Sequence, residues 1–139
     1  MVVMMRKFTE DFGRNAGKVW TTLNTRGQLN EPTLLKNTRL TTNDLYAAVG
    51  WLARENKIYK EGAFYKLGQT NLTDKIGLDA GRIWKVLESH KEVDITSIAK
   101  IANIKVRDAY SALGWLARED KIHIEKLQTD TNGIIVKLK

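Results

Sequence analysis

The phrase GWLARE occurs twice in this chain of 139 residues, at residues 50–55 and again at 114–119. The two copies belong to a longer repeat without gaps, in which residues 12–58 align with residues 76–122. The repeat implies two copies of one unit, which support each other across an interface. Identical pairs outside GWLARE include Gly17/Gly81, Trp20/Trp84, Leu23/Leu87, Asp44/Asp108, Tyr46/Tyr110 and Ala48/Ala112.

The repeat divides the chain into two small domains. We expect the first unit to span residues 1–68, a short polar linker to span 69–75, and the second unit to span 76–139. A unit of this size buries only a marginal core of its own. The short linker restricts how far the two units can separate.

The composition is that of a basic globular protein. The apolar fraction is 42%, and the absence of cysteine excludes disulfides and thiolate metal sites. No segment approaches the roughly 18 apolar residues of a membrane span, so we expect no membrane partner and a cytoplasmic location. The net charge of +7 favours an anionic partner such as nucleic acid, although a basic protein without such a partner has the same charge.

Each unit opens with the pattern of an amphipathic helix. In the first copy Val19, Trp20 and Leu23 lie on one helical face, and we expect the tryptophan to be part of the core. Asn15 and Asp79 are residue types that favour helix N-caps, so each helix is expected to start there.

A second helix, a tight turn and a longer third helix follow. The second helix begins near Pro32 in the first copy and reads TSIAKIA in the second. The third reads NDLYAAVGWLARE or RDAYSALGWLARE, with Thr41 or Thr42 as the cap of the first copy. Two strands close each unit as a hairpin. This order predicts a mainly α fold with small β-hairpins, namely two tandem winged helix-turn-helix units.

The phrases AGKVW…YAAVGWLARENKI and AGRIW…YSALGWLAREDKI resemble the small winged helix-turn-helix domain family of largely uncharacterised prokaryotic proteins. The resemblance covers both units and nearly the whole chain. It implies the fold and a presumed role in DNA binding. It implies no particular target.

In a helix-turn-helix protein the outer face of the third helix enters the major groove, and its first residues lie nearest the bases. Asn and Arg side chains there can pair with adenine and guanine. The expected base-side residues are Thr42, Asn43, Tyr46, Ala47 and Gly50 in the first copy, and Lys105, Arg107, Tyr110, Ser111 and Gly114 in the second.

Basic residues near the turns, the helix ends and the hairpins are candidates for phosphate contacts. The hairpins are only weakly basic, and the second also contains Asp130. The expected phosphate contacts are Lys36, Arg39, Arg54, Lys60, Lys66, Lys100, Arg118 and Lys126.

Gly50 and Gly114 are unusual within a helix, where glycine costs about 1 kcal/mol relative to alanine. They indicate that a DNA backbone or a partner helix approaches this face closely, and the sequence leaves both open. Trp51 and Trp115 are expected to cover the core or an interface.

The leading hypothesis is a protein that binds double-stranded DNA, either a transcriptional regulator or a chromatin-type architectural protein, associated with the nucleoid. The alternative is a protein-interaction module, possible as a homodimer or with another protein, in which the third helix is buried in an interface. His90 and His123 have no partner motif, so we expect no enzyme, no cofactor and no metal site.

Overall fold

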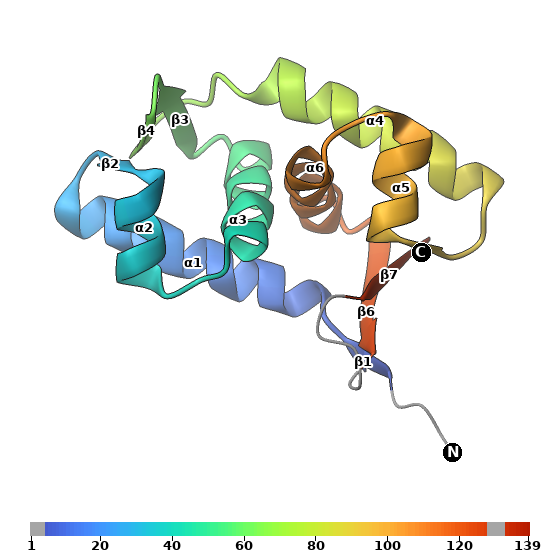
Figure 1. Cartoon of the computed structure of the whole chain (residues 1–139). Coiled ribbons are helices and arrows are strands. Elements are labelled where there is room, and N and C mark those ends of the chain that lie inside the picture. The colour runs from blue at the N-terminus through green and yellow to red at the C-terminus, as the bar shows by residue number, and fades with distance from the viewer. Residues whose placement is uncertain (1–4, 128–132) are drawn as a thin grey trace.

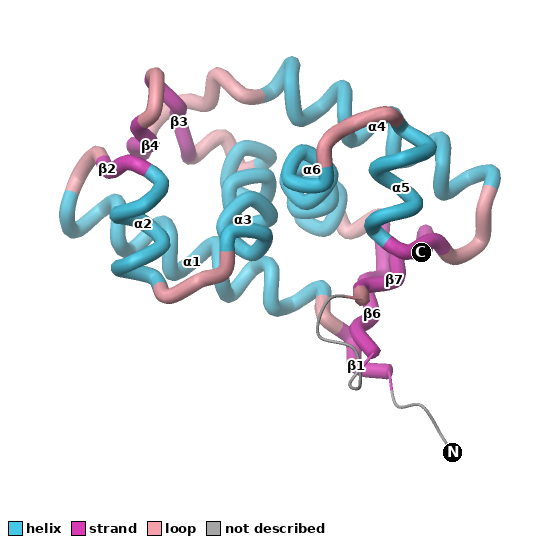
Figure 2. Tube along the Cα trace, viewed as in Figure 1, coloured by secondary structure: helices cyan, strands magenta, loops and turns pink. Residues whose placement is uncertain are grey.

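The computed structural model describes residues 5–127 and 133–139 and shows two winged helix-turn-helix units, as the sequence predicts (Figures 1 and 2). A short N-terminal strand, β1 (Met5–Lys7), precedes them. The first unit contains α1 (Thr9–Arg26), β2 (Leu29–Asn30), α2 (Glu31–Thr38), α3 (Thr42–Arg54), β3 (Ile58–Glu61) and β4 (Phe64–Leu67). The second contains α4 (Thr73–Ser89), β5 (Val93–Asp94), α5 (Ile95–Ala102), α6 (Val106–Arg118), β6 (Ile122–Leu127) and β7 (Ile134–Leu138).

Side-chain caps define where the shorter helices begin. The Asn30 side chain accepts a hydrogen bond from the backbone N–H of Thr33 at the start of α2, and Asp94 has the same role for α5. Thr41 caps α3 by accepting from the N–H of Asp44, as expected. These bonds satisfy donors that the first helical turn leaves free.

The first helix of each unit begins earlier than expected. α1 starts at Thr9 and α4 at Thr73, so Asn15 and Asp79 lie inside the helices and do not cap them. The added turns bury Phe12 and Ile76, and burial of these apolar side chains stabilises the longer helices.

The tryptophan of the first helix also differs from its expected place. Trp20 is 38% exposed, because Ala16, Val19 and Leu23 form the buried stripe of α1 and Trp20 lies at its edge. Its counterpart Trp84 is only partly buried. The expectation that this pair forms part of the core was therefore wrong for Trp20.

The wings belong to two small antiparallel sheets. The first has the strand order β2-β4-β3, and the second has the order β1-β6-β7-β5. β1 precedes the first unit in sequence but pairs with β6 of the second, with Met5 opposite Leu127 and Lys7 opposite Glu125. β1 thus joins the sheet of the second unit, and Figure 1 shows it beside β6.

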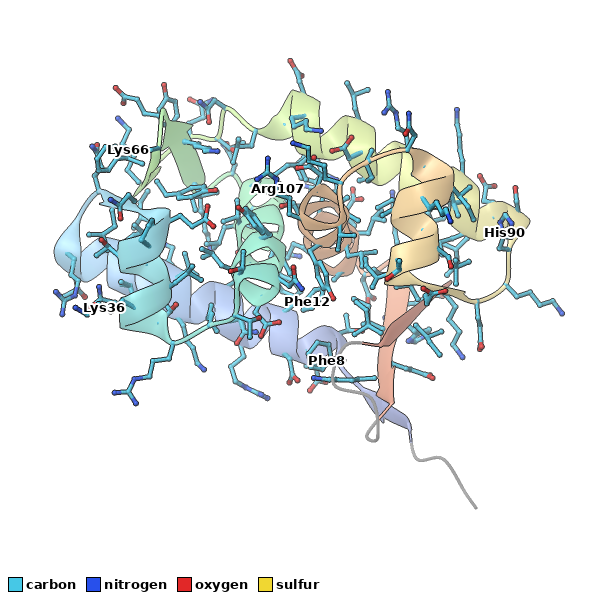
Figure 3. The ribbon with its side chains drawn as sticks, viewed as in Figure 1. Phe8, Phe12, Lys36, Lys66, His90 and Arg107 are labelled. Carbon is cyan, nitrogen blue, oxygen red and sulfur yellow. The ribbon has the colours of Figure 1, made fainter. Side chains whose placement is uncertain are left out.

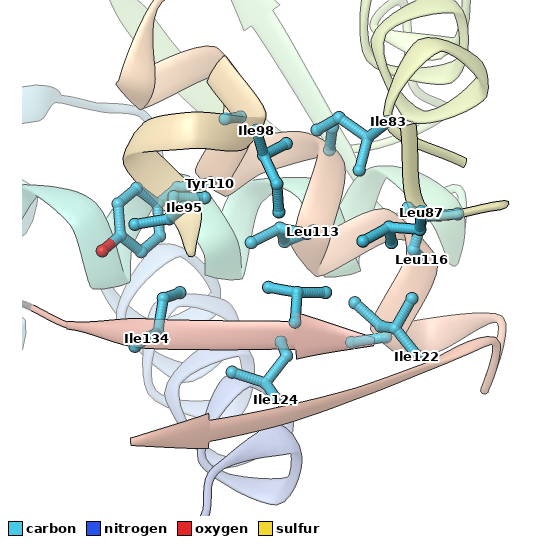
Figure 4. Close-up of a cluster of buried hydrophobic side chains, with 14 of the residues drawn as sticks. Ile83, Leu87, Ile95, Ile98, Tyr110, Leu113, Leu116, Ile122, Ile124 and Ile134 are labelled. Atoms are coloured by element: carbon cyan, nitrogen blue, oxygen red, sulfur yellow. The ribbon is translucent and has the colours of Figure 1, made fainter. Parts of the chain in front are cut away.

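Each unit has its own cluster of buried apolar side chains. The second cluster includes Ile98, Leu113 and Ile124, and Figure 4 shows it between the helices and the sheet. Phe12 of α1 also belongs to this second cluster, so α1 contributes to both units. Trp51 and Trp115 are partly buried against both clusters, as expected for residues that cover an interface.

The two units meet through α3 and α6, which lie side by side at the centre with α1 and α4 along opposite edges (Figure 1). A Cβ atom on Gly50 would lie 1.7 Å from the backbone oxygen of Ser111, and one on Gly114 would lie 1.9 Å from the oxygen of Ala47. The contact is reciprocal between equivalent positions, as at the two-fold interface of a homodimer. Glycine is required here because the two backbones touch.

Replacement of Gly50 by alanine should therefore separate the two helices. We expect the Gly50→Ala variant to lose about 2–4 kcal/mol of unfolding free energy, since a methyl group cannot fit beside a backbone oxygen. Chemical denaturation followed by circular dichroism measures this loss. Gly17→Ala in α1 is the control, because nothing lies within 4 Å of its Cβ position. It should gain up to about 1 kcal/mol, and equal stability of the two variants would contradict the assigned contact.

Candidate nucleic-acid interface

The middle of the expected reading face is not accessible in this structure. Ala47 is 0% exposed, and Gly50, Tyr110, Ser111 and Gly114 are buried as well. α3 and α6 cover each other at these positions, and the expectation that these five residues face the bases is corrected accordingly. The close approach that the two glycines indicated is made by a helix of the same chain.

The arginines of GWLARE join the two units at the C-terminal ends of α3 and α6. Arg54 Nε lies 3.0 Å from Glu119 Oε2, and Arg118 Nε lies 2.9 Å from Glu55 Oε2. The Arg54 guanidinium also lies 5.7 Å from the ring centre of Trp115, with an equivalent pair on the other side. Each guanidinium already has a carboxylate partner, so a DNA phosphate would compete with an existing ion pair.

The wing lysines also contact neighbouring side chains. Lys66 Nζ lies 3.2 Å from Glu61 Oε2, and Lys60 Nζ lies 5.6 Å from the ring centre of Tyr65. Lys126 lies over the Phe8 ring. Asp130 of the second wing lies outside the described residues. Of these three lysines Lys66 is paired with a carboxylate, whereas Lys60 and Lys126 keep their charge and lie over aromatic rings.

The turns between the second and third helices carry basic side chains that are exposed. Lys36 and Lys100 occupy equivalent positions on α2 and α5. No ion pair involves the basic residues of the turns within residues 5–127 and 133–139. Lysine and arginine side chains that are exposed and have no ion-pair partner remain available to the phosphate groups of a nucleic acid. The basic residues are Lys36, Arg39, Lys100, Lys105 and Arg107.

The first turns of α3 and α6 remain open beside these cations. Thr42 and Asn43 are exposed on α3, and Arg107 is exposed at the position of α6 that is equivalent to Asn43. Of the expected base-side residues, the structure therefore leaves exposed Thr42, Asn43, Lys105 and Arg107. They lie next to the exposed basic residues of the turns, and we call the two patches, one in each unit, together the turn surface.

Tyr46 is partly buried and engaged with a neighbour. Its hydroxyl donates to the carboxylate of Glu31, at 3.0 Å from Oε1 and 2.9 Å from Oε2. Burial raises the pKa of Tyr46, the Glu31 carboxylate raises it further, and the Arg107 guanidinium opposes both effects. Tyr46 also packs against the buried cluster of the second unit, so it lies in the contact between the units and is not free to face a base.

A polar cavity of about 260 Å³ lies between the two units, next to Tyr46. Among the residues that line it are Lys60 and Tyr65 from the first unit and Lys75 and Arg107 from the second. The sequence interpretation missed Tyr65 and Lys75. A comparison of the two copies could have indicated this cavity, because Lys60 of the first copy stands where the second copy has the apolar Ile124.

No group of three or more His, Cys, Asp or Glu side chains that could hold a metal ion occurs in the part of the chain that the structure describes. Among the same residues, no helix is long and apolar enough to cross a membrane. The Nδ1 atom of His90 lies 2.9 Å from the backbone oxygen of Val86.

Burial of Tyr65 has a consequence for alkaline stability. Desolvation raises the pKa of Tyr65 above its ordinary value of 10.0, so the unfolded chain loses this proton first as the pH rises. The raised pKa of Tyr65 therefore contributes to the free energy of unfolding in full below pH 10. Between pH 10 and the pKa of the folded state this contribution falls, by up to about 1.4 kcal/mol per pH unit. We expect the free energy of unfolding, measured by chemical denaturation, to fall less between pH 9 and pH 11 in Tyr65→Phe than in the wild type. Identical profiles would contradict this assignment.

Comparison with known proteins places the fold in a family. The family model described as winged helix-turn-helix domain (DUF2582) matches residues 5–67 and again residues 71–137. The uncharacterized protein MJ1608 of Methanocaldococcus jannaschii is 38% identical in an alignment of 71 positions that covers 47% of this chain and 91% of that protein. No solved structure shows a significant match. The chain belongs to this winged helix-turn-helix domain family, with two copies of the domain in tandem.

Proposed function

We propose that the protein binds double-stranded DNA through the turn surface. The observation that carries this proposal is the set of exposed cations without carboxylate partners at both turns, including Lys36, Lys100 and Arg107. Phosphate contacts by such side chains supply most of the affinity of a DNA-binding protein, whatever the sequence. The winged helix-turn-helix fold of the family supports the same function.

The helix contact limits how such a protein reads DNA. Only the first turns of α3 and α6 can approach base edges, because their middle faces are buried against each other. Asn43 and Arg107 are the exposed side chains suited to adenine and guanine. We infer binding dominated by the DNA backbone with a small base-specific part. That balance favours an architectural, nucleoid-associated role over a regulator with a long target sequence.

A protein-interaction role is the second candidate. Ile101 and Val106 are apolar side chains at the second turn and are 52% and 40% exposed. Exposed apolar residues of this size can mark a protein contact. The same two residues can also contact thymine methyl groups, so DNA binding accounts for them as well.

The DNA-binding proposal predicts a steep dependence on salt. Binding to a duplex of about 20 base pairs, measured by fluorescence anisotropy, should weaken strongly between about 50 and 200 mM salt. Lys100→Gln should lower the affinity and reduce the slope of log K against log salt by about one, because one phosphate contact is lost. Lys36→Gln should have a similar effect in the first unit.

Arg118→Gln is the matched control. It removes one positive charge from α6, but from a guanidinium that already pairs with Glu55. We expect it to change the salt slope less than Lys100→Gln. The absence of duplex binding at 50 mM salt would overturn the proposal. An equal or larger effect of Arg118→Gln would move the interface to the C-terminal ends of the helices.

A further inference from the structure

The cavity between the units has a counterpart on the other side of the two-fold contact, and several of the lining residues differ between the two. Two positions that line the cavity, Leu72 and Ile76 at the start of α4, correspond to Phe8 and Phe12 at the start of α1. Phe12 is fully buried in the second core, so the equivalent space is occupied by apolar side chains.

Polar residues line the open cavity where the filled counterpart is apolar. Glu31 corresponds to Ile95, and Lys60 corresponds to Ile124. Both isoleucines are buried in the second core. The shared scaffold therefore folds with apolar residues at these positions, and its packing does not require the polar lining of the first unit.

The acidic groups of the cavity are already engaged. Lys75 Nζ lies 2.8 Å from Asp79 Oδ2 and 3.5 Å from Asp108 Oδ2. Glu31 accepts a hydrogen bond from the hydroxyl of Tyr46. Lys75 offsets one of the three carboxylate charges, and Lys60 and Arg107 offset the other two, so the lining carries no net charge. The hydrogen-bond donors of Lys60 and Arg107 remain available to a ligand.

Three donors of the cavity lack an acidic partner within the described residues. The ammonium of Lys60 and the guanidinium of Arg107 form no ion pair there, and Figure 3 shows Arg107 close to the central helices. Tyr65 is only 3% exposed, and its hydroxyl has no hydrogen-bond partner in residues 5–127 and 133–139. No fully buried side-chain oxygen or nitrogen of the described residues lacks a hydrogen-bond partner, so this hydroxyl reaches the open space of the cavity, where it can donate to a ligand.

We propose that this cavity binds a small molecule carrying an oxyanion, either a carboxylate or a phosphate, through Lys60, Arg107 and Tyr65. Charged donors form strong hydrogen bonds to such groups, and an arginine can bind one in a bidentate manner. The volume of about 260 Å³ lies below the usual range for drug-sized ligands, which indicates a small metabolite. Lys60 belongs to the first unit and Arg107 to the second, so the ligand bridges the units.

Calorimetric titration of the full chain without DNA tests this proposal. The probes are citrate and inorganic phosphate, each at constant ionic strength with chloride as the reference anion. We expect one saturable site per chain for at least one probe. Lys60→Gln and Arg107→Gln should each weaken binding about tenfold or more. Lys105→Gln is the control, because Lys105 is an exposed cation of the same turn but does not line the cavity.

A second pair of variants tests the hydroxyl. Tyr65→Phe removes only the oxygen and should weaken binding, whereas Tyr59→Phe on the neighbouring strand should not. The proposal is overturned if neither probe saturates at millimolar concentration, or if binding is unchanged in Arg107→Gln and Tyr65→Phe. Because DNA is absent, failure here leaves the salt-dependent duplex binding a separate question.

Discussion

The contact between the backbones of α3 and α6 is the constraint on which the rest of the structure depends. Gly50 and Gly114 allow the two helices to touch, and the residues that follow them strengthen the same contact. The Arg118 guanidinium of α6 lies 5.9 Å from the ring centre of Trp51, and Arg54 pairs with Glu119 across the interface. The repeated phrase GWLARE therefore joins the two units, and it occurs twice because the contact is reciprocal.

This contact divides the charged residues of the third helices into two groups. Arg54 and Arg118 at the C-terminal ends are paired across the interface, whereas the cations of the two turns remain unpaired and exposed. The C-terminal ends of α3 and α6 therefore hold the two units together, whereas the turns before these helices are available to a partner. The polar cavity near Tyr46 lies beside the same helix pair. On the other side of the pair, Phe12 of α1 fills the equivalent space as part of the second core.

Much of the fold could be predicted from the sequence. The repeat, the helix order and the position of Trp51 follow from sequence patterns that the structure confirms, and of the two expected caps of α3 the structure has Thr41. The partner of the Gly50 face could not be predicted, because a small-residue face suits a DNA backbone and a helix equally well. The pairing of β1 with β6 was missed because it joins distant segments and lies outside the repeat. The cavity was missed because Lys60 was interpreted only as a wing cation.

Amide chemical-shift mapping of the labelled chain during titration with a short DNA duplex tests the central claim most directly. The account predicts the largest shifts in residues 36–43 and 100–107, with the contacts between Gly50 and Ser111 retained in the complex. Large shifts confined to residues 47–54 and 111–118, with loss of those contacts, would contradict it. Such a result would mean that DNA opens the helix pair and reads the faces that are buried in this structure.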